Sequence, residues 1–593
     1  MSKKLIIVES PSKAKTIASY VSKDVIVLSS KGHIRDLSTQ GVGGLGIDMK
    51  NEYMPIYTTI KGKAPLIKEL ITKAKGRDVL LATDPDREGE AIAWHLAQVL
   101  ELPDLSHNRI VFREITKPAI TEALLHPRPI DQHLVFSQEV RRILDRIIGF
   151  KLSKLLQSKI KSKSAGRVQS VALKLIVDLE KEIEAFIPET YFEVEATFPQ
   201  FKADYVIEPK RRLNEKEAHD IVTSSQTAFS VVNIDKKVSK SYPKPPLITS
   251  TLQQDAINQL RMTANRAMSI AQALYEGKQI NGEIVGLITY MRTDSTRMSD
   301  LFLNDLHQWI IEHHGKEYLG KVKVAKSEHA QDAHEAIRPT ALERTPEVVE
   351  PYLTKEEFKL YRHIYQRTVA SMMAPMLFDA TTVTLDANGN QYRTEGSILK
   401  FDGYAKVYQE SKQKDKKLPH LELGQVFHAT HVEAIRKETT PKTRFSEATL
   451  IKELESVGIG RPSTYAQIIQ TLKQRDYVKL EEKRFVPTEQ GRLTSEQLDL
   501  FFHKIINVEY TSKMEHVLDE IAEGKQNGGV LIEKFYHSFI PMVDIANKEM
   551  KKIGPKPTDE MCPLCGKPLV IRKSRYGEFT ACSGFPKCKF VKK

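Results

Sequence analysis

Cysteine is scarce in this chain of 593 residues: there are four, and all of them lie between residues 562 and 588. Cysteines confined to the last 32 residues argue against a disulfide framework in a protein of the cytoplasm. Long hydrophobic runs are also missing, because no apolar stretch reaches the roughly 18 residues that a membrane-spanning helix needs. The apolar segment in MSKKLIIVES, residues 1–10, is too short for a secretory signal peptide. We therefore expect a cytoplasmic protein.

A phosphate-binding loop for ATP is absent as well. None of the Gly-Lys pairs in the sequence is followed by serine or threonine, so the chain has no Walker A motif. This absence agrees with chemistry that requires no nucleotide cofactor.

Positive charge, by contrast, is in excess. The 89 lysines and arginines outnumber the 76 aspartates and glutamates, which gives a formal net charge of +13. This excess favours a polyanionic partner, although charge alone is weak evidence because many basic proteins bind no nucleic acid. The length predicts roughly four domains, and a hydrophobic content of 40% is sufficient for several cores.

The most informative segment is the acidic stretch DPDREGE, residues 84–90, which directly follows the apolar run at residues 79–82. An apolar run of this length predicts a buried strand, and the residues after the acidic stretch predict a helix. With a period of two, Asp84, Asp86 and Glu88 would project to one side as oxygen ligands for a hard cation such as Mg²⁺. The alternative is an acidic loop that only caps the helix.

A second predicted strand also ends in an acidic residue. The apolar residues 4–8 are followed by Glu9 and then by a helix-like segment at residues 11–17. Functional groups gather at the carboxyl ends of strands in open α/β sheets. Lys13 lies beside one acidic strand end and Arg87 lies within the other. This pattern is typical of a metal and phosphate site.

Several motifs together resemble one family. IVESPSKAKTI with DPDREGEAIAWHL resembles the TOPRIM domain of type IA DNA topoisomerases. Further signatures of that family follow in its order: SAGRVQSVALKLI (164–176), PPLITSTLQQDA (245–256), GLITYMRTDST (286–296), QDAHEAIRPT (331–340) and GIGRPSTYAQII (458–469). The resemblance runs from residue 3 to the C-terminus and is greatest to the bacterial topoisomerase I branch.

Tyr290 occupies the position of the family's DNA-linking tyrosine. A phenol with a pKa of about 10 is a poor nucleophile unless cations or a base stabilise the phenolate. The resemblance implies that Tyr290 takes the 5′ phosphate of a cut strand and releases a 3′ hydroxyl. Glu9 would be the general acid for that hydroxyl and the base on religation. Lys13 and Arg292 would stabilise charge on the phosphoryl oxygens.

The resemblance implies further site residues. His334 would contact the scissile phosphate or support Tyr290 through Asp294, and a helical turn would place His334 and Arg338 on one face. The expected Mg²⁺ ligands are Glu9, Asp84, Asp86 and Glu88. The expected DNA contacts are His33, Arg35, Arg87, Arg167, Gln169, Arg338, Arg461 and Thr464. The structural alternatives are a capping histidine and solvated charges at helix starts.

The cysteine tail predicts a metal site of a different kind. Two cysteine pairs separated by sixteen residues are the donor set of a structural tetrahedral Zn²⁺ site: Cys562, Cys565, Cys582 and Cys588. Unmetallated thiols are the alternative. Residues 551–593 contain eleven lysines and arginines against three acidic residues, interspersed with Tyr576, Phe579, Phe585 and Phe590. Aromatic rings beside cations predict single-strand binding, although some of these rings must fill the small core.

We predict a multidomain fold that combines α/β, helical and β-rich parts. The expected units are a TOPRIM α/β domain (1–130), a helical domain with a single-strand groove (131–190 and 446–550), a β-rich arch (191–248 and 371–445), a helical domain with Tyr290 (249–370) and a zinc module (558–593). The resemblance implies that the first four enclose a hole wide enough for duplex DNA. Asn388-Gly389 predicts a hairpin turn.

The leading functional hypothesis is ATP-independent relaxation of negatively supercoiled DNA by a nucleoid-associated, monomeric enzyme that cuts, passes and religates one strand. Its partners would be single-stranded and supercoiled DNA. A topoisomerase III-like decatenase is the alternative within the family. A TOPRIM nuclease or primase would lack the tyrosine motif, and a non-enzymatic DNA-binding protein would leave the acidic residues unused.

Overall fold

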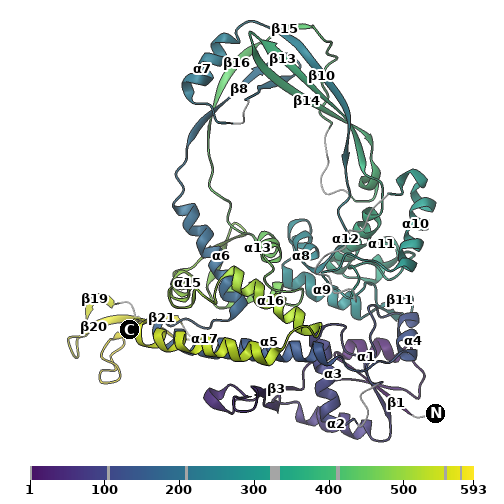
Figure 1. Ribbon diagram of the computed structural model, residues 1–593, viewed down its shortest axis with the longest axis vertical. Coiled ribbons are helices and arrows are strands. Elements are labelled where there is room, and N and C mark those ends of the chain that lie inside the picture. The colour runs from purple at the N-terminus through teal and green to yellow at the C-terminus, as the bar shows by residue number, and fades with distance from the viewer. Residues whose placement is uncertain are drawn as a thin grey trace.

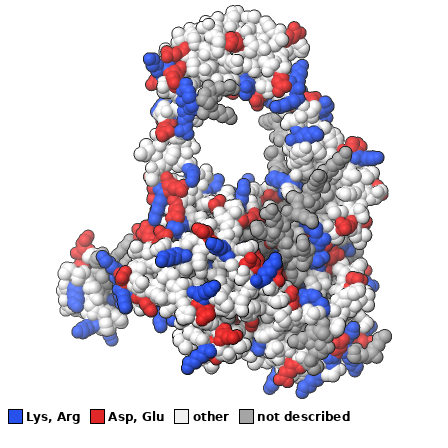
Figure 2. Space-filling view, viewed as in Figure 1, with Lys and Arg blue, Asp and Glu red and all other residues white. Residues whose placement is uncertain are grey.

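The computed structural model describes residues 3–102, 107–207, 211–320, 334–408, 415–552, 557–574 and 577–592. The molecule is a ring in which a β-rich arch stands on a base of helices and the N-terminal domain (Figure 1). The hole remains open in the space-filling view, with lysines and arginines on both of its flanks (Figure 2). The expected toroidal architecture is confirmed. Among the described residues, no helix has the length and apolar character that crossing a membrane would require.

The N-terminal domain is built on a parallel sheet with the order β2-β1-β7, comprising β1 (Lys4–Val8), β2 (Ile26–Ser29) and β7 (Asp78–Leu81). Its other elements are α1 (Pro11–Ala18), β3 (Arg35–Leu37), η1 (Val42–Gly44), β4 (Ile47–Asp48), β5 (Met54–Pro55), β6 (Tyr57–Thr59), α2 (Ala64–Ala74), α3 (Arg87–Val99) and α4 (Lys117–Leu125). Because β1 and β7 run parallel, their carboxyl ends lie at the same edge of the sheet.

The base consists mainly of helices that share one core. They are α5 (Gln132–Ile160), α6 (Arg167–Glu184), α13 (Glu447–Ser456), α14 (Tyr465–Gln474), α15 (Glu489–Phe502), α16 (Val508–Ala522) and α17 (Gly528–Glu549). A small hairpin of β17 (Val478–Glu481) and β18 (Arg484–Pro487) follows α14. Residues 132–184, with α5 and α6, and residues 447–549, with α13 to α17, therefore form one helical domain. The apolar faces of their helices bury one another.

The arch is a seven-stranded sheet with the order β15-β10-β13-β14-β9-β8-β16. Its elements are β8 (Thr190–Thr197), β9 (Lys202–Tyr205), α7 (Glu215–Ser224), β10 (Ala228–Ser241), β13 (Met376–Ala387), β14 (Asn390–Phe401), β15 (Val426–His428) and β16 (His431–Glu438). Asn388 and Gly389 join β13 to β14 with φ of 56° and 83°. Positive φ at both positions is what a tight hairpin turn requires, so the predicted hairpin is confirmed.

A helical insert lies between the two sets of arch strands and carries Tyr290. It contains α8 (Thr249–Asn258), α9 (Ala264–Glu276), β11 (Lys278–Ile280), β12 (Glu283–Val285), α10 (Asp300–His314), η2 (Lys316–Tyr318), α11 (Pro346–Val349), η3 (Glu350–Tyr352) and α12 (Lys355–Ser371), with η4 (Gly403–Lys406) after β14. Ile6 and Val8 of β1 share a core with Leu274 and Leu287 of the insert. This packing places Tyr290 against the acidic edge of the N-terminal sheet.

The C-terminal tail is a small three-stranded antiparallel sheet of β19 (Pro557–Met561), β20 (Pro568–Ser574) and β21 (Gly577–Cys582). Its described core contains little apolar area, namely Leu569 with three of the cysteines and Phe590. A domain this small needs an additional constraint to fold, which a metal ion would supply.

Candidate active site and DNA interface

Glu9 and Asp84 lie together at the carboxyl ends of β1 and β7. Glu9 Oε1 accepts a hydrogen bond from the backbone N–H of Asp84 at 2.7 Å. The fully buried Lys13, in the first turn of α1, forms an ion pair with Asp84. Gly89 is needed for this arrangement, because a Cβ there would lie 2.2 Å from the carbonyl oxygen of Asp84. The sheet and the first turns of α1 and α3 thus hold the Glu9 carboxyl, the Asp84 carboxylate and the Lys13 ammonium close together.

The protonation of Glu9 suits proton transfer. Burial, followed by the nearby charge of Asp84, raises the pKa of Glu9 to about 8, although Lys13 acts in the opposite direction. A carboxyl group with such a pKa holds its proton at neutral pH and can act as a general acid.

Tyr290 reaches this edge from the insert. Its Oη donates a hydrogen bond to Asp86 Oδ2 at 2.7 Å, and Arg292 Nη1 lies 3.5 Å from the same oxygen. Burial, followed by the charges of Asp84 and Asp86, raises the pKa of Tyr290 well above its ordinary value. The phenol is therefore neutral in the free protein, and its use as a nucleophile would require a phosphate or cation to compensate the phenolate charge.

The acidic residues do not alternate along a strand as the period of two predicts. The strand ends at Leu81, Asp86 is the N-cap of α3 and accepts from the backbone N–H of Gly89 at 2.8 Å, and Glu88 lies in the first helical turn. That prediction was wrong because the chain turns into the helix directly after Pro85. Asp86 caps the helix, as the alternative interpretation of this stretch expects, and it also accepts the hydrogen bond from Tyr290.

The four predicted Mg²⁺ ligands have the hard oxygen donors that this ion prefers. In the structure they pair with protein groups: Asp84 with Lys13, Asp86 with Tyr290 and Arg292, and Glu88 with His33. Of the residues that the structure describes, only the tail cysteines are gathered closely enough to hold an ion. To bind Mg²⁺, some of these carboxylates must therefore give up their present partners for the ion.

The segment around His334 differs from its prediction. Ile337 bridges to Leu247 and Pro339 to Ile288, so the chain is extended here and the expected helical turn is wrong. His334 Nε2 lies 2.6 Å from the carbonyl oxygen of Pro85, which makes Nε2 the protonated nitrogen. Residues 331–333 of this motif lie outside the described residues.

Neighbours of His334 are largely enclosed. Arg338 is buried and pairs with Glu335 at 2.9 Å and Glu114 at 3.2 Å, at the wall of a cavity that Pro85 and His334 also line. Burial raises the pKa of Asp294, and the nearby His334 opposes this effect. The placement of Arg338 favours a supporting role for it, and direct DNA contact remains a prediction.

Two carboxylates of α16 form ion pairs with three of the predicted DNA-binding arginines. Glu515, which is fully buried, pairs with Arg167 Nη1 at 2.7 Å. Asp519 pairs with Arg461 Nη2 at 2.5 Å and also with Arg87 of the N-terminal domain. Glu515 and Asp519 were not found from the sequence, because nothing local distinguishes them from other acidic residues four positions apart on a helix.

The charge of Glu515 is secured by its surroundings. Burial alone would raise its pKa, but Arg141, Arg167 and Arg461 together hold the pKa of Glu515 down to about 2. Glu515 therefore stays ionised and organises the arginines from one central position. Asp519 is about one-third exposed and lies closer to solvent.

Of the remaining predicted contacts, Thr464 and Gln169 lie in the helical base and Arg35 lies in β3 of the N-terminal domain. Thr464 Oγ1 accepts from the backbone N–H of Arg461 at 2.8 Å and so stabilises the turn that presents this arginine. Gln169 lies half-buried in the first turn of α6, beside Gly166. Arg35 is engaged in the protein, with its Nη2 2.9 Å from His95 Nδ1 and its guanidinium over the ring of Trp94.

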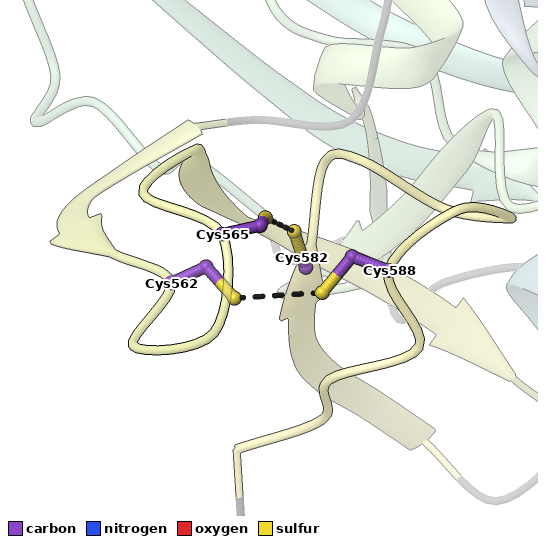
Figure 3. Close-up of side chains that lie close together, drawn as sticks. All are labelled: Cys562, Cys565, Cys582 and Cys588. Atoms are coloured by element: carbon purple, nitrogen blue, oxygen red, sulfur yellow. Dashed lines mark hydrogen bonds between the residues drawn. The ribbon is translucent and has the colours of Figure 1, made fainter.

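The four tail cysteines point toward one another (Figure 3). All four sulfurs lie within 4.8 Å of one another, with Cys562 and Cys588 3.7 Å apart and Cys565 and Cys582 3.2 Å apart. Tetrahedral zinc–thiolate bonds place the sulfurs about 3.8 Å apart. The donor set and its spacing therefore fit one structural Zn²⁺.

The aromatic residues of the tail divide between two roles. Phe590 packs against the cysteine cluster, whereas Phe585 is exposed and has the Arg572 guanidinium over its ring at 5.1 Å. Tyr576 lies outside the described residues. An exposed ring beside a cation is suited to stacking on a nucleic-acid base.

Comparisons with known proteins agree with this geometry. Residues 129–533 match the DNA topoisomerase family, residues 4–115 the Toprim domain, and residues 559–593 the topoisomerase DNA-binding C4 zinc finger. The chain is similar to full-length topoisomerase I from Thermotoga maritima, with 38% identity and a TM-score of 0.85 over 99% of this chain and 97% of that one.

These matches also bear on cofactors and class. Toprim domains typically bind Mg²⁺, and the C4 zinc finger with its clustered cysteines supports Zn²⁺. The match to the topoisomerase family covers more than half of the sequence, and the solved relative covers nearly all of it. The chain therefore belongs to the type IA DNA topoisomerases, a family of DNA-binding isomerases.

Proposed function

We propose that this protein relaxes negatively supercoiled DNA, as a topoisomerase I does, by cutting one strand, passing DNA through the break and religating it. The observation that carries the proposal is the buried Tyr290, hydrogen-bonded to Asp86 at 2.7 Å beside Glu9 and Lys13. A nucleophile, a proton donor and a cation for phosphate meet there.

The cleavage step is a phosphoryl exchange. Tyr290 Oη attacks the phosphorus, the bond from phosphorus to the 3′ oxygen breaks, and Glu9 gives its proton to that oxygen. The phenolic proton leaves along the hydrogen bond to Asp86, and Lys13 and Arg292 offset the charge of the phosphate. One phosphodiester is replaced by another, so religation needs no nucleotide.

Strand passage requires the ring to open. The Tyr290–Asp86 hydrogen bond and the contact of His334 with the Pro85 carbonyl are two of the contacts that join the insert to the N-terminal domain at the site. The Thr16–Glu276 hydrogen bond and the shared apolar core join the same two parts and would have to separate as well. Separating them would move a strand end held covalently on Tyr290 away from a 3′ end held on the N-terminal side. The hole would then receive the passing DNA.

The test is relaxation of negatively supercoiled plasmid by the purified protein as a function of Mg²⁺, without ATP, alongside decatenation of linked circles. We expect Mg²⁺-dependent relaxation that exceeds decatenation. No relaxation under any Mg²⁺ concentration would refute the proposal, and dominant decatenation would favour the topoisomerase III-like alternative.

A further inference from the structure

A second tyrosine lies beside the proposed nucleophile. Tyr275, near the end of α9, is fully buried, and its ring centroid is 5.3 Å from that of Tyr290 in an edge-to-face arrangement of 63°. Lys13 Nζ lies over the Tyr275 ring, 5.3 Å from its centroid. A hydrogen bond from Thr16 Oγ1 to the Glu276 carbonyl, at 2.7 Å, fastens this end of α9 to α1.

The hydroxyl group of Tyr275 has no hydrogen-bond partner in the described part of the chain. Buried hydroxyls are nearly always paired, because an unpaired one costs folding free energy. Two tyrosines of the nearby α12 follow that rule: Tyr361 donates to the Arg344 carbonyl at 2.6 Å and Tyr365 to the Leu342 carbonyl at 2.7 Å. The Tyr275 ring thus packs beside Tyr290 and Lys13, whereas its buried hydroxyl makes no hydrogen bond within the described residues.

The surroundings of Tyr275 keep its proton in place. Burial, followed by the charges of Asp84 and Glu9, raises the pKa of its phenol well above the ordinary value. The group is consequently a hydrogen-bond donor throughout the working pH range. Its neighbours Tyr290, Lys13 and Glu9 are the groups that the proposed reaction uses.

We propose that the Tyr275 hydroxyl donates a hydrogen bond to a nonbridging oxygen of the scissile phosphate as Tyr290 attacks. This rests on the proposed function, since it requires Tyr290 to be the nucleophile. No bond at Tyr275 is made or broken. Its hydroxyl and the Lys13 ammonium together stabilise the charge that builds on the phosphoryl oxygens, and the same two groups act when religation reverses the step.

The test is Tyr275→Phe, which keeps the ring and its contacts with Lys13 and Tyr290 and removes one oxygen. Loss of a single preorganised donor typically slows catalysis by about 10²-fold to 10³-fold. We expect single-turnover cleavage and religation of an oligonucleotide to slow about equally, by at least ~10²-fold, with unchanged oligonucleotide binding. The melting temperature should stay the same or rise, because an unpaired buried hydroxyl is removed.

The matched control is Tyr361→Phe, which removes a hydrogen bond that is made. It should lower the melting temperature and leave the cleavage rate unchanged. Wild-type cleavage and religation rates in Tyr275→Phe would overturn the proposal, as would a rate loss matched by loss of folded protein. Failure of the proposed function would look different, because the wild-type protein would then form no adduct through Tyr290.

Discussion

Tyr290 donates a hydrogen bond to Asp86 across 204 positions of sequence, at 2.7 Å. One partner lies in an extended segment of the insert and the other caps α3 of the N-terminal domain. The bond therefore joins two parts of the ring at the point where we propose the strand is cut. Tyr290 can donate this hydrogen bond only while the insert and the N-terminal domain are in contact.

Glu9→Gln should slow both cleavage and religation by about 10²-fold to 10⁴-fold, the usual contribution of general acid–base catalysis. The Glu9 carboxyl, with its pKa raised to about 8, is protonated below that pH and loses its proton above it. Cleavage measured without Mg²⁺ should thus fall as the pH rises through about 8.

A pH–rate profile of oligonucleotide cleavage checks this prediction. The decline near pH 8 should vanish in Glu9→Gln and persist in Glu122→Gln, which alters an exposed glutamate of α4. An unchanged decline in Glu9→Gln would assign the titration to another group and leave Glu9 a positioning role.

The paired change Asp84→Asn with Asp86→Asn should abolish Mg²⁺-dependent plasmid relaxation, because two carboxylates supply much of the ligand charge that a hard cation needs. Oligonucleotide cleavage should slow, because the Asp86 carboxylate that accepts the Tyr290 proton is lost, but it should survive in part, since the tyrosine attack does not formally require the metal. A Mg²⁺ titration of relaxation is the measurement, with Asp78→Asn, an exposed change at the opposite end of β7, as control. Undiminished relaxation at low Mg²⁺ would reduce these residues to a helix cap.

Asp519→Asn should tighten binding of single-stranded DNA, because the carboxylate that occupies Arg87 and Arg461 loses its charge. Two freed cations should also steepen the salt dependence, as more counterions are released on association. Fluorescence anisotropy at several salt concentrations measures both effects. Glu509→Gln, an exposed change on the same helix, controls for net charge. Weaker binding by Asp519→Asn would instead show that Asp519 holds these arginines in place for DNA.

Truncation before Cys562 should spare oligonucleotide cleavage and impair plasmid relaxation, since every proposed catalytic residue lies upstream of the tail. The lost basic residues should also make the salt dependence of DNA binding shallower. Cys565→Ser should resemble the truncation, because a module this small folds on binding zinc. Metal analysis should find about one Zn²⁺ per intact chain and little in the variant. Equal relaxation and salt dependence with and without the tail would contradict this role.

Short-range patterns in the sequence predicted much of this fold. The apolar run Lys4–Val8 forms the central strand, Asn388-Gly389 forms a hairpin, and the cysteine spacing gathers four sulfurs. The motif predicts Tyr290 as the nucleophile, and its position against the acidic edge supports our proposal of that role. In each case the deciding signal lies within a few residues.

Features that depend on distant partners were missed or wrong. The turn at His334–Arg338 is extended because it pairs with Leu247 and Ile288, which no local window reveals. Glu515 reaches Arg141 across 374 positions, and Tyr275 is distinguished only by the absence of a partner for its hydroxyl in the described structure. Burial and pairing of polar groups are tertiary properties, so the sequence pattern carries little trace of them.

The most direct test of the account is covalent trapping on a single-stranded oligonucleotide labelled at its 3′ end. Tyrosine attachment to the 5′ phosphate should leave the label on the protein, and peptide mapping should place it on Tyr290. Tyr290→Phe should bind the oligonucleotide almost as well and form no adduct, because only the nucleophilic oxygen is lost. A labelled adduct that persists in Tyr290→Phe, or that maps to another residue, would contradict the account.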